Sequence, residues 1–359
     1  MLRRTNLSLI IDFIVGWIIG LSLLFFLRGY GIPEYRPVRA TLLDNVVIIL
    51  IFGCLAGILF GFIQVRSERY YQQRLPLGAL LVISLFIHSV AIVLISGMIY
   101  LTYVYVFGLD DVAFGQFIRH PSFTVFFVYA ILVNAILIVL RQVNLLLGPG
   151  NLMRFVRGEF YHPHEEVMIF MFLDLRSSTT IAEQLGHIRY SRLIQDCFSD
   201  LRLVSAYKAR VYQYVGDEAV LTWKQAEGLK NHNCLRAFFE FEALLLRRAD
   251  YYQDAYGMVP SFKAGMNVGV VTVAEVGVIK REIAFHGDTI NTAARIEGMC
   301  NALDASLLIS GALHQQLEVS SEFNSENVDT MNLRGKQETI NLYTIEKTPS
   351  YVSSLSPNS

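Results

Sequence analysis

The first 150 residues alternate between long apolar runs and short polar connections. Four runs of mainly hydrophobic side chains cover about residues 7–27, 45–65, 80–107 and 123–147. A helix needs ~20 such residues to cross the hydrocarbon core of a bilayer. One run alone would also fit a buried helix of a soluble protein. Four in succession favour a four-helix transmembrane domain over residues 1–147.

From residue 165 the pattern changes to short apolar runs that alternate with amphipathic segments, as in α/β and α+β domains. We expect strands at 167–173, 210–215, 219–223, 262–268, 271–278 and 339–346. We expect helices at 178–185, 190–207, 231–256 and 289–299. These elements predict a second domain over residues 165–347.

Glycine and proline mark the junction between the two halves. Gly148-Pro149-Gly150 ends the last apolar helix. Residues 148–164 are therefore predicted as a short linker, with one or two helical turns at 152–156. The Ser/Pro-rich residues 348–359 are predicted to form a disordered tail.

Composition excludes several classes of protein. The formal net charge of -1 gives no field for nucleic acid. The four cysteines lack metal-ligand spacing and are expected to be reduced thiols. The first apolar run is too long for a cleavable signal peptide and lacks a small-residue cleavage site.

Arginine positions predict how the apolar runs are oriented, because positive loops stay on the cytoplasmic side. Both termini, and with them the second domain, are predicted to lie in the cytoplasm of a multi-pass inner (plasma) membrane protein. The supporting positive residues are Arg3, Arg4, Arg66, Arg69, Arg74, Arg141, Arg154 and Arg157, with Asp110 and Asp111 in the third loop. Arg28, Arg36 and Arg39 in the first loop oppose this orientation.

Three polar residues, Asp12, His88 and Asn134, lie inside the apolar runs. Such residues at membrane depth are costly and often functional. Packing or interhelical hydrogen bonding is the favoured interpretation here, and a sensor role is the alternative. The loops are too short for a folded extracellular domain. A regulator would therefore be a small or lipidic ligand, or a partner membrane protein.

Two acidic stretches carry the candidate chemistry of the second domain. Asp174 and Asp217 each follow a strand-like apolar run. Mg²⁺ favours a few carboxylates together with substrate phosphates, so this pair could hold divalent cations beside a nucleotide. Arg176-Ser177-Ser178-Thr179 follows Asp174 where a helix begins, and free N–H groups at a helix start suit phosphate oxygens. Taken alone, Asp174 is better explained as a helix cap and Asp217 as a turn residue.

Two later motifs add groups that suit a nucleotide. Asn291 and Arg295 are four residues apart on a predicted helix and share one face. An amide and a guanidinium there suit a ribose oxygen and a phosphate that gains charge in the transition state. Leu333-Arg334-Gly335-Lys336 offers two cations around a glycine. Surface capping and a solvated basic turn are the alternatives.

As an ordered set, FLDLRSST, YVGDE, AGMNVG, GDTINTAAR and LRGK resemble the motifs of the class III nucleotide cyclases. The resemblance covers about residues 166–346. It implies an α+β, ferredoxin-like βααβαβ core with added strands. It also implies a head-to-tail homodimer with active sites at the interface, so that a monomer would be inactive.

The resemblance assigns roles to single residues. It implies two Mg²⁺ or Mn²⁺ ions per active site, held by Asp174, Asp217 and the backbone carbonyl of Leu175. It implies that Asn291 orients the ribose and that Arg295 stabilises the transition state. The resemblance further implies that Lys336 holds the triphosphate. Lys263 stands where many relatives carry an arginine for the outer phosphates. Glu218 and Asp288 are expected as turn residues or supports for the ligands.

The residues expected to contact the base depart from the family patterns. Adenylate-forming members usually carry lysine at the position of Gln213 and aspartate or threonine at the position of Ala284. Guanylate-forming members typically carry glutamate and cysteine at these two positions. Gln213 offers both a donor and an acceptor to a base edge. ATP is favoured because adenylate cyclases are the commoner bacterial type among membrane-anchored chains.

The resulting hypothesis is a membrane-anchored adenylate cyclase that converts ATP to 3′,5′-cyclic AMP and pyrophosphate. A guanylate cyclase acting on GTP is one alternative. A catalytically silent nucleotide-binding membrane sensor is the other.

Overall fold

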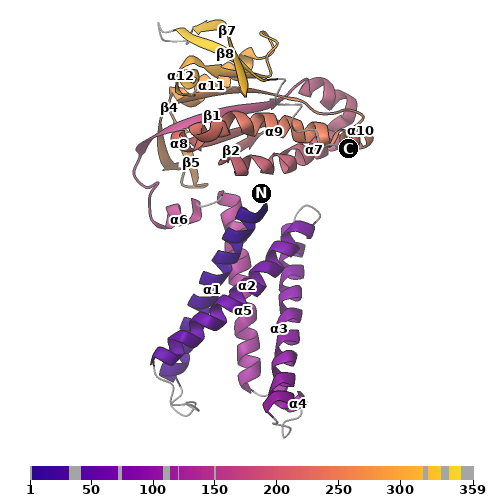
Figure 1. Ribbon diagram of the computed structural model, residues 1–359, viewed down its shortest axis with the longest axis vertical. Coiled ribbons are helices and arrows are strands. Elements are labelled where there is room, and N and C mark those ends of the chain that lie inside the picture. Colours follow the sequence, from indigo (N-terminus) through magenta and orange to yellow (C-terminus); the bar gives the residue numbers. More distant parts are fainter. Residues whose placement is uncertain are drawn as a thin grey trace. The chain divides into compact units, whose positions relative to one another are not determined.

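A computed structural model describes residues 2–31, 42–71, 75–107, 114–119, 121–148, 151–317, 322–332 and 339–348. The chain divides into two compact units, Met1–Leu146 and Leu147–Ser359 (Figure 1). Predictions that rest on Arg36, Arg39, Arg74, Asp110, Asp111, Pro149, Gly150 and the tail from residue 349 lie outside the described residues.

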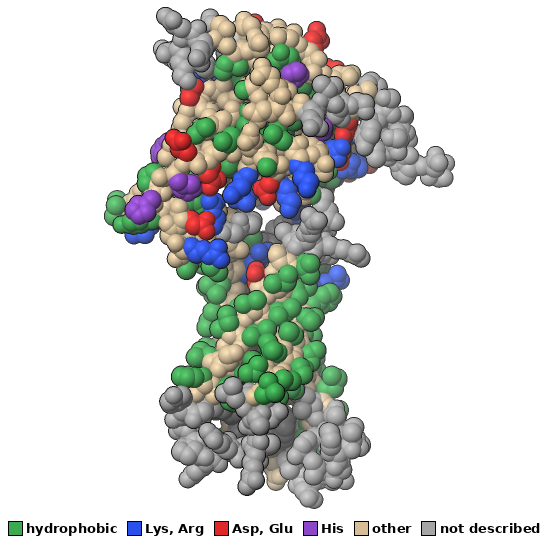
Figure 2. Space-filling view, turned by 60° about the vertical axis from the view of Figure 1, so that its left-hand side comes forward, with side chains coloured by type: hydrophobic (Ala, Val, Ile, Leu, Met, Phe, Trp, Pro, Cys, Tyr) green, Lys and Arg blue, Asp and Glu red, His purple; other side chains and the backbone are tan. Residues whose placement is uncertain are grey.

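The first unit is helical. It consists of α1 (Leu2–Gly31), α2 (Leu42–Tyr71), α3 (Leu77–Phe107), α4 (Phe114–Arg119) and α5 (Pro121–Leu147). Among the described residues, four segments are long and apolar enough to cross a membrane: Leu7–Leu27, Asn45–Glu68, Leu77–Met98 and Phe123–Leu147. They agree with the four predicted runs apart from a few residues at the ends. Hydrophobic side chains also cover the outward face of these helices (Figure 2), as expected for helices surrounded by lipid.

Small residues let α1 and α2 approach closely. Gly53, Gly57 and Gly61 are spaced by four residues and lie against Ile18, Ile14 and Ile10 of α1. A Cβ atom at Gly61 would stand 3.0 Å from the Ile10 Cα. This is the pattern by which transmembrane helices pack backbone against backbone.

A polar network ties three of these helices together. Ser84 Oγ on α3 donates to Gln64 Oε1 at 2.6 Å, and Gln64 Nε2 donates to Glu68 Oε1 at 3.1 Å. Arg141 on α5 donates to both Glu68 oxygens, at 3.2 and 3.3 Å. Each polar group thereby offsets the cost of burying another.

The three polar residues noted in the apolar runs have different surroundings. His88 is buried, and its Nδ1 lies 2.7 Å from the Ser84 carbonyl oxygen. Asn134 is buried, and its Nδ2 donates to the Ala130 carbonyl at 3.0 Å. Asp12 is exposed on α1. Their functional roles remain predictions.

The described residues of the second unit form a mixed sheet of eight strands. Its main path runs β2-β3-β1-β4-β6-β8-β7, and β5 pairs with β4. β4 and β6 are parallel, and the other pairs are antiparallel. The strands are β1 (His164–Leu175), β2 (Arg210–Val215), β3 (Glu218–Lys224), β4 (Phe262–Val276), β5 (Glu282–His286), β6 (Leu307–Ser310), β7 (Phe323–Asn332) and β8 (Thr339–Lys347).

Helices complete the second unit and confirm an α+β domain. They are α6 (Asn151–Val156), α7 (Ser178–Asp200), α8 (Gln225–Leu229), α9 (Asn233–Arg247), α10 (Ala249–Tyr256), α11 (Asp288–Met299) and α12 (Gly311–Gln316). Two 3₁₀ segments, η1 (Leu201–Tyr207) and η2 (Lys230–His232), join them.

Alternation along the central strand divides the core between the two faces of the sheet. Ile169, Met171 and Leu173 of β1 join the main core with residues of α7, η1 and α9. Met168 and Phe170 face the other side, in a cluster that includes residues of β3, β4 and α11. Phe172 belongs to the same side as Met168 and Phe170. Asp174 is two residues further along β1, so its side chain also lies on the α11 face.

Several predicted boundaries were wrong. The strands expected at 262–268 and 271–278 form one strand, β4, because Gly269 and Val270 continue the extended backbone. The helices expected at 178–185 and 190–207 form α7 and η1, and Gly186 adopts a positive φ of 70° inside α7. The long helix expected at 231–256 breaks at Arg248, which pairs with Asp200.

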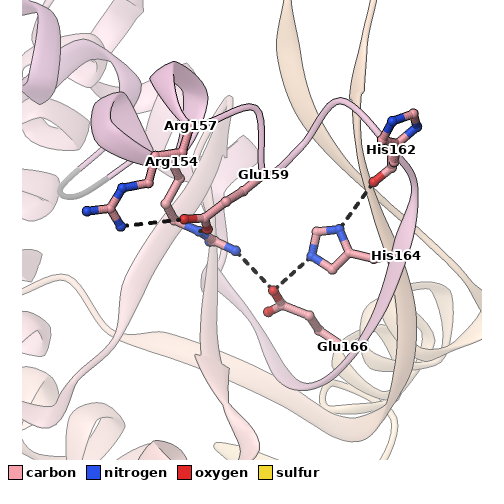
Figure 3. A network of polar contacts seen from close by, with 6 residues as sticks. All are labelled: Arg154, Arg157, Glu159, His162, His164 and Glu166. Atoms are coloured by element: carbon pink, nitrogen blue, oxygen red, sulfur yellow. Dashed lines mark hydrogen bonds and ion pairs between the residues drawn. The ribbon is translucent and has the colours of Figure 1, made fainter.

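The segment before β1 is bound to the sheet (Figure 3). Arg154 of α6 donates to Glu159 at 2.8 Å and to Glu166 at 3.0 Å, and His164 Nε2 lies 3.1 Å from Glu166 Oε1. Phe160 is only 1% exposed and lies in the α11-side cluster. Much of the predicted linker is therefore fixed on the second unit.

Candidate active site

Three charged residues form a row across the ends of three neighbouring strands. Asp174 of β1 pairs in register with Glu218 of β3 on one side and with Lys263 of β4 on the other. Paired residues of adjacent strands project to the same face of a sheet. All three side chains therefore lie on the α11 face, with Asp174 in the centre.

Asp217 enters the site from the hairpin between β2 and β3. Gly216 adopts a φ of 63°, a conformation that glycine takes at little cost, and this turn brings Asp217 next to Glu218. The side chain of Tyr190, on α7, interacts with those of Asp217 and Ser178. Burial and the negative charge of Asp217 raise the pKa of Tyr190 to about 12, so the phenol remains a donor at neutral pH. Sequence reasoning missed Tyr190.

The residues after Asp174 begin α7, as predicted. Ser177 precedes the helix with a φ of 54°, and Ser178 is its first residue. The side chains of Ser177 and Thr179 are exposed, so the first turn is open to a ligand. Arg176 is held elsewhere, because its Nη2 donates to the Ala305 carbonyl at 2.6 Å. Leu175 turns its side chain into the main core.

Two glycines of the AGMNVG motif let α11 approach β4. Gly265 lies against Glu297 and Ala293, and Gly269 lies against Thr289. Asn267, between the two glycines, donates to the Thr289 carbonyl at 3.1 Å. Small residues on this face of β4 thus determine where α11 lies.

The structure brings Asn291 and Arg295 together on the side of α11 that faces away from the sheet. Thr289, Ala293 and Ile296 form the buried side of the helix, whereas Asn291 is exposed. At 3.6 residues per turn, Asn291 lies ~165° and Arg295 ~130° around the helix axis from the centre of that buried side. Arg295 Nη1 is buried without a hydrogen-bond partner among the described residues.

Lys263 links Asp174 to α11. Its Nζ lies 3.0 Å from Asp174 Oδ2 and also pairs with Glu297. Burial alone would lower the pKa of Lys263, but hydrogen bonds to Glu297 and Asp174 raise that pKa overall. Glu297 is a second residue that sequence reasoning missed. It stands two residues after Arg295, in a part of the helix that the motif does not mark.

The segments that carry Gln213 and Ala284 meet on the α11 face. A bulge next to Gln213 leaves Tyr212 as the extra residue of β2. The Tyr212 ring contacts the Phe285 ring edge-on, with 4.9 Å between centroids, and Phe285 follows Ala284 in β5. Gln213 itself is exposed.

The donor groups at this end of the sheet fit a small divalent cation. Asp174 and Asp217 offer carboxylate oxygens, which Mg²⁺ and Mn²⁺ prefer. Burial, followed by the charges of Glu297, Asp174 and Asp217, raises the pKa of Glu218 to about 7. These carboxylates thus share one negative field that a cation would relieve. No group of three or more His, Cys, Asp or Glu suited to a metal occurs among the described residues.

Lys336 lies in residues 333–338, outside the described residues, so its role stays a prediction.

A family model for the adenylate and guanylate cyclase catalytic domain matches residues 160–347, more than half of the chain. The chain belongs to this class III cyclase family. The matched residues include every strand of the second unit and every candidate site residue named above.

Curated relatives resemble the same part of the chain. Adenylate cyclase 2 of Rhizobium meliloti (strain 1021) is 32% identical over 217 residues, which are 60% of this chain and 60% of that protein. An adenylate cyclase of Anabaena cylindrica is 24% identical over 192 residues, 50% of this chain and 36% of that protein. The chain thus spans less than two thirds of either relative.

A solved structure supports the fold. A bacterial light-regulated adenylyl cyclase superposes with a TM-score of 0.52 at 19% identity, covering 61% of this chain and 65% of that one. Together with the four apolar helices, this confirms the predicted fold class, a helical candidate membrane domain followed by a cyclase domain.

Proposed function

We propose that the protein is a membrane-anchored adenylate cyclase that converts ATP to 3′,5′-cyclic AMP and pyrophosphate. The observation that carries this proposal is the arrangement of two groups of residues on one face of the sheet. Asp174 and Asp217 lie at the strand ends. Asn291 and Arg295 share the outer side of α11, where Arg295 has a buried donor that finds no partner in the part of the chain that the structure describes.

Asp174, Asp217 and the carbonyl of Leu175 would hold two Mg²⁺ or Mn²⁺ ions. These ions would activate the ribose 3′-hydroxyl and neutralise the leaving phosphates. The chain's own contribution is to position the groups. Asn291 orients the ribose, and Arg295 donates to the α-phosphate oxygens as their charge grows. The exposed first turn of α7, at Ser177, Ser178 and Thr179, binds phosphate oxygens through its free N–H groups.

The active site forms between two copies of the chain, in a head-to-tail homodimer. Helix geometry supports this arrangement. Glu297 meets Lys263 and Asp174 on one side of α11. Arg295 is two residues earlier and therefore ~200° around the helix axis. The Asn291–Arg295 pair thus faces away from the aspartates of its own chain and toward a partner.

ATP is the proposed substrate because the two curated relatives described above are named adenylate cyclases. Gln213 and Ala284, on segments that meet, are the proposed contacts of the base. Gln213 can pair with the donor and the acceptor on the adenine edge. GTP is the alternative substrate, since neither residue matches the usual pattern of either kind of cyclase.

The four apolar helices are proposed to anchor the enzyme in the inner membrane, with both termini and the cyclase domain cytoplasmic. Their buried Ser84–Gln64–Glu68–Arg141 network joins α2, α3 and α5. A small or lipidic ligand, or a partner membrane protein, would regulate the enzyme by shifting these helices.

Product analysis tests this proposal. The full chain in lipid nanodiscs is incubated with Mn²⁺ and either ATP or GTP, and cyclic nucleotides are separated by chromatography. Cyclic AMP from ATP, absent in Asp174→Asn, is expected. Formation of cyclic GMP from GTP, without any cyclic AMP from ATP, would identify the protein as a guanylate cyclase instead. Nucleotide binding without any cyclic product would favour the silent sensor.

A further inference from the structure

Lys263 is a buried cation that lies against a residue proposed to bind metal. Only 6% of the residue is exposed. Its Nζ lies 3.0 Å from Asp174 Oδ2 and is also paired with Glu297. The register of β1 and β4 sets Lys263 directly beside Asp174. This ammonium is therefore held by two carboxylates and is not directed into open space.

The charges around Lys263 are unbalanced. Asp174, Asp217, Glu218 and Glu297 all act on the same small region, since burial and then the charges of Glu297, Asp174 and Asp217 raise the pKa of Glu218. Lys263 is the cation that opposes this rise. Like charges this close destabilise one another unless a cation lies between them. In the metal-free protein that cation is Lys263.

We propose that Lys263 holds Asp174 in the metal-free protein and competes with the divalent cations for that carboxylate. This role rests on the proposed function, because it assumes that Asp174 binds metal. Metal binding displaces the ammonium from Asp174 toward Glu297, its second partner. The Lys263–Glu297 pair therefore sets the metal concentration at which the site fills. This differs from a direct contact between Lys263 and the outer phosphates.

The geometry gives two substitutions with opposite signs. Lys263→Met removes the competing cation, so Mn²⁺ binds at about tenfold lower concentration, the scale on which one adjacent charge changes the ionisation of a carboxylate. Glu297→Gln leaves Lys263 with Asp174 as its only charged partner and removes one negative charge. Mn²⁺ binding then needs about tenfold higher concentration.

Mn²⁺ binding to the full-length protein is measured without nucleotide, by electron paramagnetic resonance of free Mn²⁺. Lys347→Met is the matched control, because Lys347 pairs with Glu240 at 3.3 Å between β8 and α9, away from the aspartates. The control binds Mn²⁺ like the wild type. Weaker binding in both variants would reflect general damage to the site and would overturn the proposal.

A second readout separates this role from phosphate binding. Unchanged Mn²⁺ binding in Lys263→Met, with a raised KM for ATP, would make Lys263 a phosphate contact and overturn the inference. If Lys263→Met does not fold, weaker binding in Glu297→Gln supports the proposal, and unchanged or tighter binding contradicts it. The wild type could also lack cyclase activity while Lys263→Met binds Mn²⁺ more tightly and Glu297→Gln binds it more weakly. That result would support the inference and refute the proposed function.

Discussion

Gly265 of β4 lies directly beneath Glu297 of α11. A Cβ atom at Gly265 would stand 2.5 Å from the Glu297 Cα and 2.7 Å from the Ala293 carbonyl oxygen. Both obstacles are backbone atoms, so a side chain at this position forces the whole helix to move. The placement of Asn291 and Arg295 on α11 thus depends on the absence of a side chain at position 265, on the strand beneath that helix.

Gly265→Ala is expected to destabilise the protein by ~1–3 kcal/mol, the usual cost of overpacking a core. It should also reduce turnover, because α11 carries Asn291 and Arg295. Gly298→Ala, on α11 itself, is the matched control. A Cβ atom there meets nothing within 4 Å, and alanine favours helix over glycine by ~1 kcal/mol. Urea unfolding of both variants checks this. Equal stability of the two would contradict the packing argument.

Asp174→Asn and Asp217→Asn are expected to lower turnover by more than about a hundredfold, since loss of a residue that merely supports a metal ligand already costs 10–100-fold. Both side chains keep their volume, so the circular dichroism spectrum should stay that of the wild type. Initial rates with saturating Mn²⁺ and ATP provide the measurement. Near-normal rates in either variant would remove that aspartate from the metal site.

Glu218 should make the metal-free protein less stable as the pH rises. Its pKa is about 7 in the folded chain, mainly because of burial, and 4.5 as a model value. Between these values the folded state binds more protons than the unfolded state, so the free energy of unfolding falls from about pH 4.5 to 7. The Glu218→Gln variant does not lose stability in this way. The Tm of this variant minus the Tm of the wild type, both measured in EDTA, should therefore increase between about pH 4.5 and 7. A constant difference would contradict the raised pKa.

Gln213 and Ala284 are expected to govern the choice of purine. Gln213→Glu with Ala284→Cys introduces the pair typical of guanylate-forming relatives, and should raise the kcat/KM ratio of GTP over ATP by about tenfold or more, because a base edge left unpaired is strongly rejected. The double variant and the wild type are compared with both nucleotides. An unchanged ratio would move base recognition to other residues.

The sequence carried strong signals for the elements that hold the candidate site. The apolar run before Asp174, the Gly216-Asp217 turn and the periodic helix around Asn291 and Arg295 have local patterns that survive in the fold. Four apolar runs likewise appear as four long helices.

Other features depend on distant parts of the chain. The strands β5 and β6 have only five and four residues, too short for a periodic signal, and the polar β7 is held by pairing with β8. The resemblance assigned Lys263 to the outer phosphates, and only the register of β4 shows that it lies between Asp174 and Glu297. One local signal was available: Lys263, Gly265, Asn267 and Gly269 alternate on one face of β4, and this face of small and polar residues receives α11.

The central claim is a cyclase site shared between two chains, and a mixing experiment tests it most directly. Asp174→Ala and Arg295→Ala chains are each expected to be inactive. In a mixed dimer, one of the two sites receives an intact aspartate pair from one chain and an intact Asn291–Arg295 pair from the other. Random pairing then predicts cyclic AMP production of about a quarter of wild type from the mixture. No recovery, with mixed dimers confirmed by differential tagging, would contradict the account.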